Sequence, residues 1–256
     1  MAAAVEEKYT ETIYMLKQKF IAVAAMAVLA IIIGQSNAFA FGGNTKKQVS
    51  FKVRVENISN KDGIAASDGT RYPFALSPGF YAVTGGGLDF FKAGAKASGT
   101  IEAQAEDGSP EMLSKVVLAK QFTGSFGIFN KPTGADMPSP ILPGGAYKFN
   151  FMAKKGMTLN LVTMFGQSND LFYAPAKAIA LFDDKGNPVT GDITNFFELW
   201  DAGTEVNQAP GIGADQGPRQ KAKNTGAAES GVVRLVNDGF VYPNTKDVLR
   251  ITISAN

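Results

Sequence analysis

The chain has 256 residues, of which 45% are hydrophobic and 19% charged, and its 25 basic residues nearly balance its 23 acidic ones. These values are typical of one large or two small globular domains and show no basic excess that would favour nucleic acid. The sequence contains no cysteine and no histidine, which excludes disulfides, thiolate nucleophiles, imidazole bases and zinc sites built from those residues. Any metal that this chain binds is therefore expected to be a hard cation with oxygen ligands.

Residues 1–40 are predicted to be a secretory signal peptide. Lys17 and Lys19 precede an apolar run of 14 residues, 20–33, and Ala38-Phe39-Ala40 matches the small-residue pattern of a cleavage site. The run is shorter than the ~20 residues that a membrane-spanning helix requires, so cleavage after Ala40 is expected. The mature protein is then expected to be secreted, periplasmic or extracellular, without a transmembrane segment.

A linker at residues 41–48 is expected to lead into one β-rich domain over residues 49–256. Alternation of apolar and polar residues from 49 to 56 predicts a half-buried first strand. Further strands are predicted at residues 80–83, 122–129, 147–152, 157–165, 178–182, 232–237 and 247–254. Turn signals of the Pro-Gly and Lys-Gly type separate these short strands, a pattern that predicts an all-β fold, an antiparallel β-sandwich.

Only one short helix is predicted. Ser109 is a suitable N-cap, Pro110 a suitable first helical residue, and apolar residues follow between 112 and 118. The lack of regularly alternating helices and strands argues against a doubly wound α/β fold. Long loops are expected at residues 130–146 and 201–231; such loops in a compact domain are functional or disordered, and the many polar side chains of the second favour function.

Three other motifs have simple structural explanations. Gly85-Gly86-Gly87 lacks the Lys-Ser/Thr of a phosphate-binding loop and is interpreted as a flexible loop. Residues 183–187 contain acidic residues and glycine, but their spacing is wrong for a calcium loop and no glutamate closes it, so a hairpin turn is predicted. Trp200, the only tryptophan, is interpreted as a core residue rather than a platform for a ligand.

Two polar clusters each follow an apolar strand segment: Gln167-Ser168-Asn169-Asp170, and the residues from Asp201 to Glu205. If these strand ends meet at one end of the sandwich, Asp170, Asp201 and Glu205 bring three carboxylates together. Their mutual repulsion would favour protonation, and a Ca²⁺ ion would relieve it because calcium takes six to eight oxygen ligands and needs no histidine or cysteine. A solvated pair of acidic loops explains the same spacing.

A set of motifs extends through most of the mature chain. They are Leu76-Ser77-Pro78-Gly79, Gln167-Ser168-Asn169-Asp170-Leu171-Phe172, Leu199-Trp200-Asp201-Ala202-Gly203-Thr204-Glu205-Val206-Asn207, Pro210-Gly211, Gly217-Pro218-Arg219-Gln220 and Val232-Val233-Arg234-Leu235-Val236. Through them, residues 49–254 resemble the spondin N-terminal domain family, which is found in F-spondin and mindin and in many secreted bacterial proteins. The Trp-Asp-Ala-Gly-Thr-acid motif is the most specific part, and the similarity is to the bacterial branch.

The resemblance implies an antiparallel β-sandwich similar to calcium-dependent membrane-targeting domains, with a calcium ion at one end. It also implies the calcium ligands, which by motif fall on Asp170, Asp201 and Glu205. Animal members carry aspartate where this chain has Glu205, and the longer side chain moves the carboxylate outward, which puts the affinity in question. The cysteines and partner domains of the animal members are missing, so their matrix partners are not transferred.

Residues and resemblance together lead us to expect a secreted, calcium-binding, non-enzymatic module of the adhesion type. Its calcium-ordered loops would face a lipid headgroup, a glycan or a protein. Arg219, Lys221 and Lys223 lie near these loops and would favour an anionic partner, although a solubilising loop is the simpler explanation of these three residues. The alternatives from the sequence are a secreted hydrolase that uses two carboxylates and a purely structural component of an envelope or matrix.

Overall fold

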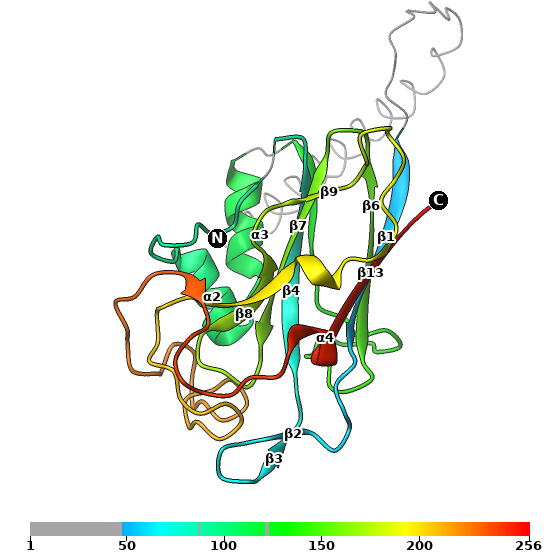
Figure 1. The fold of residues 1–256 in the computed structure, drawn as a ribbon. Coiled ribbons are helices and arrows are strands. Elements are labelled where there is room, and N and C mark those ends of the chain that lie inside the picture. The colour runs from blue at the N-terminus through cyan, green and yellow to red at the C-terminus, as the bar shows by residue number, and fades with distance from the viewer. Residues whose placement is uncertain (1–47, 87, 121–122) are drawn as a thin grey trace, which may run out of the picture. The chain divides into compact units, whose positions relative to one another are not determined.

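The computed structural model describes residues 48–86, 88–120 and 123–256, which belong to one compact unit spanning Lys46–Asn256 (Figure 1). The predicted signal peptide, residues 1–40, and all but the last residue of the predicted linker lie outside the described residues, so both stay predictions. None of the helices described is long and apolar enough to cross a membrane.

The described residues form an antiparallel β-sandwich, as the sequence predicts. One sheet consists of β1 (Val49–Asn57), β6 (Ala146–Ala153), β10 (Gly191–Asp192) and β13 (Leu249–Ala255). The other consists of β4 (Leu76–Thr84), β5 (Gly124–Phe129), β7 (Thr158–Phe165), β8 (Leu171–Pro175), β9 (Ile179–Ala180), β11 (Phe197–Asp201) and β12 (Arg234–Leu235). The first sheet has the order β10-β13-β1-β6 and the second β12-β11-β8-β7-β4-β5, with β9 paired to β7. A separate hairpin joins β2 (Ile64–Ala65) to β3 (Arg71–Tyr72).

The core lies between the two sheets. The predicted alternation of β1 is confirmed, because Phe51, Val53 and Val55 are fully buried while Lys52 between them is exposed. Aromatic side chains fill much of the space: the rings of Tyr81 from β4 and Phe149 from β6 stack across the two sheets with centroids 4.1 Å apart. This contact joins strands of different sheets that are remote in the sequence.

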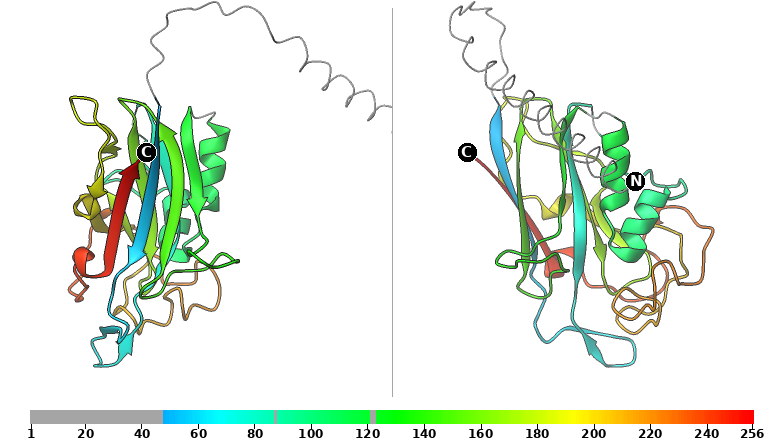
Figure 2. Two further views of the ribbon diagram at one scale, coloured as in Figure 1. Left: turned by 90° about the vertical axis from the view of Figure 1, so that its right-hand side faces the viewer. Right: turned by 180° about the vertical axis from the view of Figure 1, so that it is seen from behind.

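The seven-stranded sheet is covered on its outer face by two helices, α2 (Gly99–Asp107) and α3 (Glu111–Ala119) (Figure 2). Their buried residues pack on apolar side chains of the sheet, including Trp200, which donates from Nε1 to the carbonyl of Ala174 over 3.1 Å. Trp200 is thus a core residue, as interpreted from the sequence. The helix after Pro110 is confirmed, but its N-cap is Pro110 and not Ser109, and it begins at Glu111. The helix α2 was not predicted because its sequence has little apolar periodicity. Short helical turns also occur at Thr194–Phe196 and in α4 (Thr245–Val248).

The acidic segment 183–187 is a hairpin turn. The carboxylate of Asp183 accepts hydrogen bonds from the backbone N–H and the side-chain amide of Asn187 over 2.8 and 2.9 Å. Gly186 adopts a positive φ of 89°, the left-handed conformation that glycine supplies at least cost. These contacts close the turn through its own side chains.

Two tyrosines in the core offer a matched test of buried hydroxyl groups. Tyr147 Oη donates to the carbonyl of Ser139 over 2.7 Å, whereas Tyr173 Oη is buried and has no partner among the residues that the structure describes. We expect Tyr147→Phe to lower the free energy of unfolding by about 1 kcal/mol, and Tyr173→Phe to leave it unchanged or raise it, since an unsatisfied polar group is removed. Urea unfolding at constant m-value measures both; equal losses in the two variants would contradict this account.

Candidate functional site

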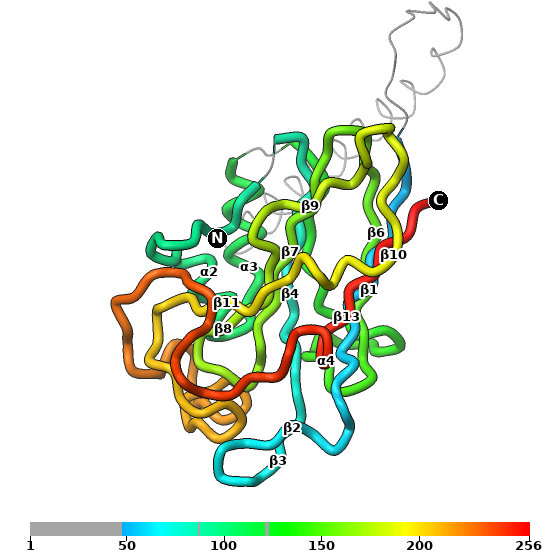
Figure 3. The backbone as a smooth tube through the Cα atoms, in the orientation of Figure 1, coloured from blue at the N-terminus to red at the C-terminus, as the bar shows by residue number. Residues whose placement is uncertain are grey.

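Two buried strands bring Asp170 and Asp201 together. Asp170 immediately precedes β8, and Asp201 is the last residue of β11. The two strands are antiparallel with Asp201 opposite Leu171, and the Ala202 N–H donates to the carbonyl of Asp170 over 3.1 Å. Both aspartates therefore lie at the same end of the seven-stranded sheet. Figure 3 shows the long segment 201–231, coloured yellow to orange, looping beyond this end.

Local turns fix the two aspartates. Ser168 Oγ donates to the carbonyl of Phe165 over 2.6 Å and accepts the N–H of Leu171 over 3.1 Å, which closes the turn before β8. After β11 the chain turns at Gly203, with φ of 68°. A Cβ at this glycine would lie 2.7 Å from the backbone nitrogen of Val232, so a side chain there would displace the neighbouring segment.

Asp170 is fully buried, and only one of its two carboxylate oxygens has hydrogen-bond partners. Its Oδ2 accepts the backbone N–H of Thr204 over 2.7 Å and that of Glu205 over 3.1 Å. Its Oδ1 is buried and has no partner in the described part of the chain. Burial, and next the negative charge of Asp201, raise the pKa of Asp170 to about 6.

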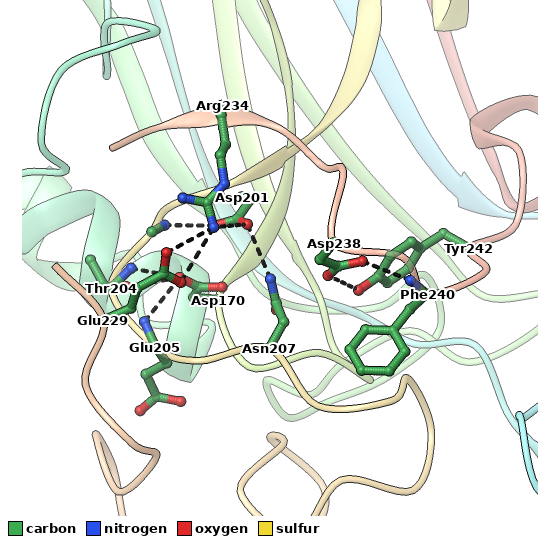
Figure 4. A network of polar contacts seen from close by, with 11 residues as sticks. Asp170, Asp201, Thr204, Glu205, Asn207, Glu229, Arg234, Asp238, Phe240 and Tyr242 are labelled. Atoms are coloured by element: carbon green, nitrogen blue, oxygen red, sulfur yellow. Dashed lines mark hydrogen bonds and ion pairs between the residues drawn. The ribbon is translucent and has the colours of Figure 1, made fainter. Parts of the chain in front are cut away.

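Asp201 is also fully buried but has three partners (Figure 4). Oδ1 accepts the Gly203 N–H over 2.7 Å, and Oδ2 accepts the Asn207 side-chain amide over 3.1 Å. Nη2 of Arg234 lies 2.8 Å from Oδ2 and 3.0 Å from Glu229 Oε1. Burial still raises the pKa of Asp201, because these favourable contacts do not fully offset the loss of solvent.

Glu205 reaches the site with its backbone rather than its carboxylate. While its N–H donates to Asp170, its side chain turns away from both aspartates (Figure 4). Oε1 accepts the Gly226 N–H over 2.9 Å, and Oε2 accepts the Asn169 amide over 3.4 Å. No group of three or more acidic residues in the described ranges is arranged so that it could hold a metal ion. The structure thus brings together Asp170 and Asp201, with the Glu205 carboxylate directed elsewhere.

Two residues that the sequence analysis did not single out belong to this region. Asn207 Oδ1 is buried and lacks a partner within the described residues, although its amide binds Asp201. Glu106 of α2 is buried with an equally unpartnered Oε2; burial, together with the charge of Glu205 among others, raises its pKa to about 7. Asn207 lies within the longest quoted motif, whereas Glu106 had no signal because its helix was not predicted.

The nearby basic residues divide into internal and exposed ones. Arg219 is only partly exposed, and donates from Nε to the carbonyl of Gly213 over 2.7 Å and from Nη1 to Gln167 Oε1 over 3.1 Å. It therefore holds the long loop to the turn before β8. Lys221 and Lys223 are exposed, and Lys223 donates to Ser109 Oγ over 2.7 Å. Of the three residues expected to favour an anionic partner, two present their charge to solvent.

The region as a whole concentrates buried negative charge. Glu106, Asp170, Asp201 and Glu205 are each at most 2% exposed. Among the described residues, Arg234 is the one cation that forms an ion pair with any of them. Buried carboxylates are costly unless they are paired, protonated or bound to a metal. This arrangement can therefore take up protons or a cation.

Comparison with known proteins adds no identification. No protein-family model matches the chain, and no curated protein matches it. The resemblance to spondin N-terminal domains therefore stays a prediction that rests on the motifs described above.

Proposed function

We propose that this protein is a secreted, non-enzymatic calcium-binding module of the spondin type, whose loops at one end of the sandwich are ordered by Ca²⁺. The observation that supports the proposal most directly is the Asp170 carboxylate. It is fully buried, lies beside Asp201, and keeps one oxygen without a partner in the described part of the chain. A hard cation is the ligand that such oxygens prefer.

The oxygens present fit a calcium ion in part. Asp170 and Asp201 would supply carboxylates, and Asn207 an amide oxygen that is buried without a partner among the residues described. Glu205, the third ligand implied by the resemblance, would join only by leaving Gly226 and Asn169. When bound, calcium would supply positive charge that offsets the repulsion between the buried carboxylates.

The proposed role of the ion is to fasten the turn before β8 to the loop after β11. The loop surface would then be offered to a partner outside the cell, whether lipid headgroup, glycan or protein. Val206, next to Glu205, is 50% exposed, and Lys221 is exposed on the same long segment. These are the apolar and basic side chains that such a partner would meet.

Calorimetric titration of the EDTA-treated, dialysed protein with CaCl₂ tests the proposal. We expect saturable binding, weakened at least tenfold by Asp170→Asn, because a charged ligand oxygen is lost. Asp136→Asn, which removes an exposed carboxylate from the loop 130–146, should leave the affinity unchanged. Glu205→Gln should change it less than about threefold, since glutamine keeps an acceptor for the Gly226 N–H. Absence of binding at millimolar calcium would refute the proposal.

A further inference from the structure

A cavity of about 540 Å³ lies where the start of β4, the end of β7 and the end of α2 meet residues 139–142 of the loop before β6 and residues 217–220 of the loop after β11. Its volume falls within the range of small-molecule sites, about 300–1,000 Å³. None of Asp170, Asp201, Glu205 and Asn207 lines it. The cavity therefore contains none of the proposed calcium ligands, although Gln167 of the turn before β8 lines it.

Most of the cavity wall is apolar. Four prolines contribute to it, together with Met164 of β7 and Leu142 of the loop 130–146. Met164 is buried and can adapt its flexible thioether to a bound group, whereas Leu142 is 53% exposed. A ligand with an apolar body would cover the Leu142 side chain and remove that surface from water, which is favourable.

One charged residue, Asp107, lines the cavity. Asp107 is the last residue of α2, where the negative end of the helix dipole favours a cation. Its Oδ1 accepts the side-chain amide of Gln220 over 3.2 Å and the N–H of Asn224 over 3.3 Å, both neutral donors. In the ranges that the structure describes, it takes part in no ion pair. Its negative charge is thus available to a ligand.

We infer that this cavity binds a small organic cation, a primary amine carried on an apolar body. The ammonium group would lie at Asp107, and the body would pack between Met164 and Leu142. The Asp107 carboxylate would repel an anionic ligand. A neutral ligand could not form a charge-assisted hydrogen bond with it.

Three six-carbon probes separate the contribution of the ligand's charge from that of its apolar body: hexylamine, hexanol and hexanoate. The purified protein, labelled with ¹³C at the methionine methyl groups, is titrated with each probe in EDTA, so that the outcome does not depend on calcium. We expect a saturable shift of the Met164 methyl resonance, with hexylamine binding about tenfold more tightly than hexanol, and hexanoate more weakly than either. The methyl groups of Met112, Met137 and Met152, which are exposed and do not line the cavity, should not shift.

Variants test the Asp107 carboxylate and the apolar wall of the cavity separately. Asp107→Asn should abolish the tenfold preference for hexylamine over hexanol while leaving hexanol binding intact, and Asp136→Asn should change neither. Leu142→Ser, at a position that is 53% exposed, should weaken the binding of hexylamine and of hexanol together. The inference is overturned if the Met164 methyl does not shift, if hexanoate binds as tightly as hexylamine, if the preference for hexylamine persists in Asp107→Asn, or if Leu142→Ser leaves the binding of both probes unchanged.

Discussion

Calcium is expected to raise the midpoint of thermal unfolding by roughly 5–10 °C when its concentration is about a hundredfold above Kd. An ion that binds only the folded form stabilises it by mass action, by about 2.7 kcal/mol at that excess. In a domain of this size each kcal/mol shifts the midpoint by about 2–4 °C. A melt of the same protein in EDTA and in millimolar calcium, followed by circular dichroism, measures the shift.

The variant Asp170→Asn distinguishes a calcium effect from a general change in stability. In EDTA it should be no less stable than the unmodified protein, because it removes a buried charge while its amide oxygen can still accept the N–H groups of Thr204 and Glu205. In calcium, however, its midpoint should not rise. Asp136→Asn, a change on an exposed loop, should keep the full rise. A rise that survives in Asp170→Asn would place calcium elsewhere on the chain.

The parts of the fold that the sequence predicts well are those with a strong local pattern. The alternation in β1 and β13, and the presence of a helix after Pro110, depend on neighbouring residues and were predictable, although the helix begins one residue later than Ser109 and Pro110 suggested. By contrast, β8 was not predicted as a strand, and β11 was anticipated only as an apolar strand segment before Asp201, although both strands position the two aspartates. Both are only five residues long, and all of β8 and most of β11 are buried, so they lack the alternation that identifies a half-buried strand.

In the candidate site, too, the features without a local sequence pattern could not be predicted. That Asp170 and Asp201 lie side by side could be anticipated from polar residues at two strand ends. The direction of the Glu205 side chain could not, because it is set by Gly226, 21 residues farther along. A Cβ at Gly226 would lie 2.1 Å from Glu205 Oε2, so a larger residue there would push the Glu205 carboxylate out of its present position. Such a contact between two irregular segments leaves no periodic trace in the sequence.

The buried carboxylates also make the stability of the protein depend on pH: the free energy of unfolding is expected to fall as the pH rises. The pKa values of Asp170 and Glu106, about 6 and about 7, lie above their ordinary values of 3.8 and 4.5. Between the ordinary and the raised pKa, the folded protein holds protons that the unfolded chain has released, so the free energy of unfolding falls as pH rises. The stabilisation by these protons is fully present below the ordinary values and is lost once the pH passes the raised ones.

In EDTA we therefore expect the free energy of unfolding to fall by about 3 kcal/mol or more between about pH 4.5 and 7.5, given ~1.4 kcal/mol per pKa unit and two such groups. Most carboxyl groups whose pKa is lowered in the folded state, such as Asp183 and Asp192, are already ionised across this range and do not offset the loss. Urea unfolding at a series of pH values measures the profile.

The variant Glu106→Gln separates the contribution of Glu106 to this pH dependence from that of Asp170. Glutamine cannot lose a proton, so the fall should shrink by about half and the part that remains should be centred at lower pH, where Asp170 titrates. Calcium should also flatten the profile of the unmodified protein, because the ion replaces the protons that Asp170 releases and binds more tightly as pH rises. It should act in the same way on Glu106→Gln, which keeps Asp170 and Asp201. A flat profile in EDTA would mean that these carboxylates are solvated in the folded protein, and the electrostatic reason for a cation at this site would be lost.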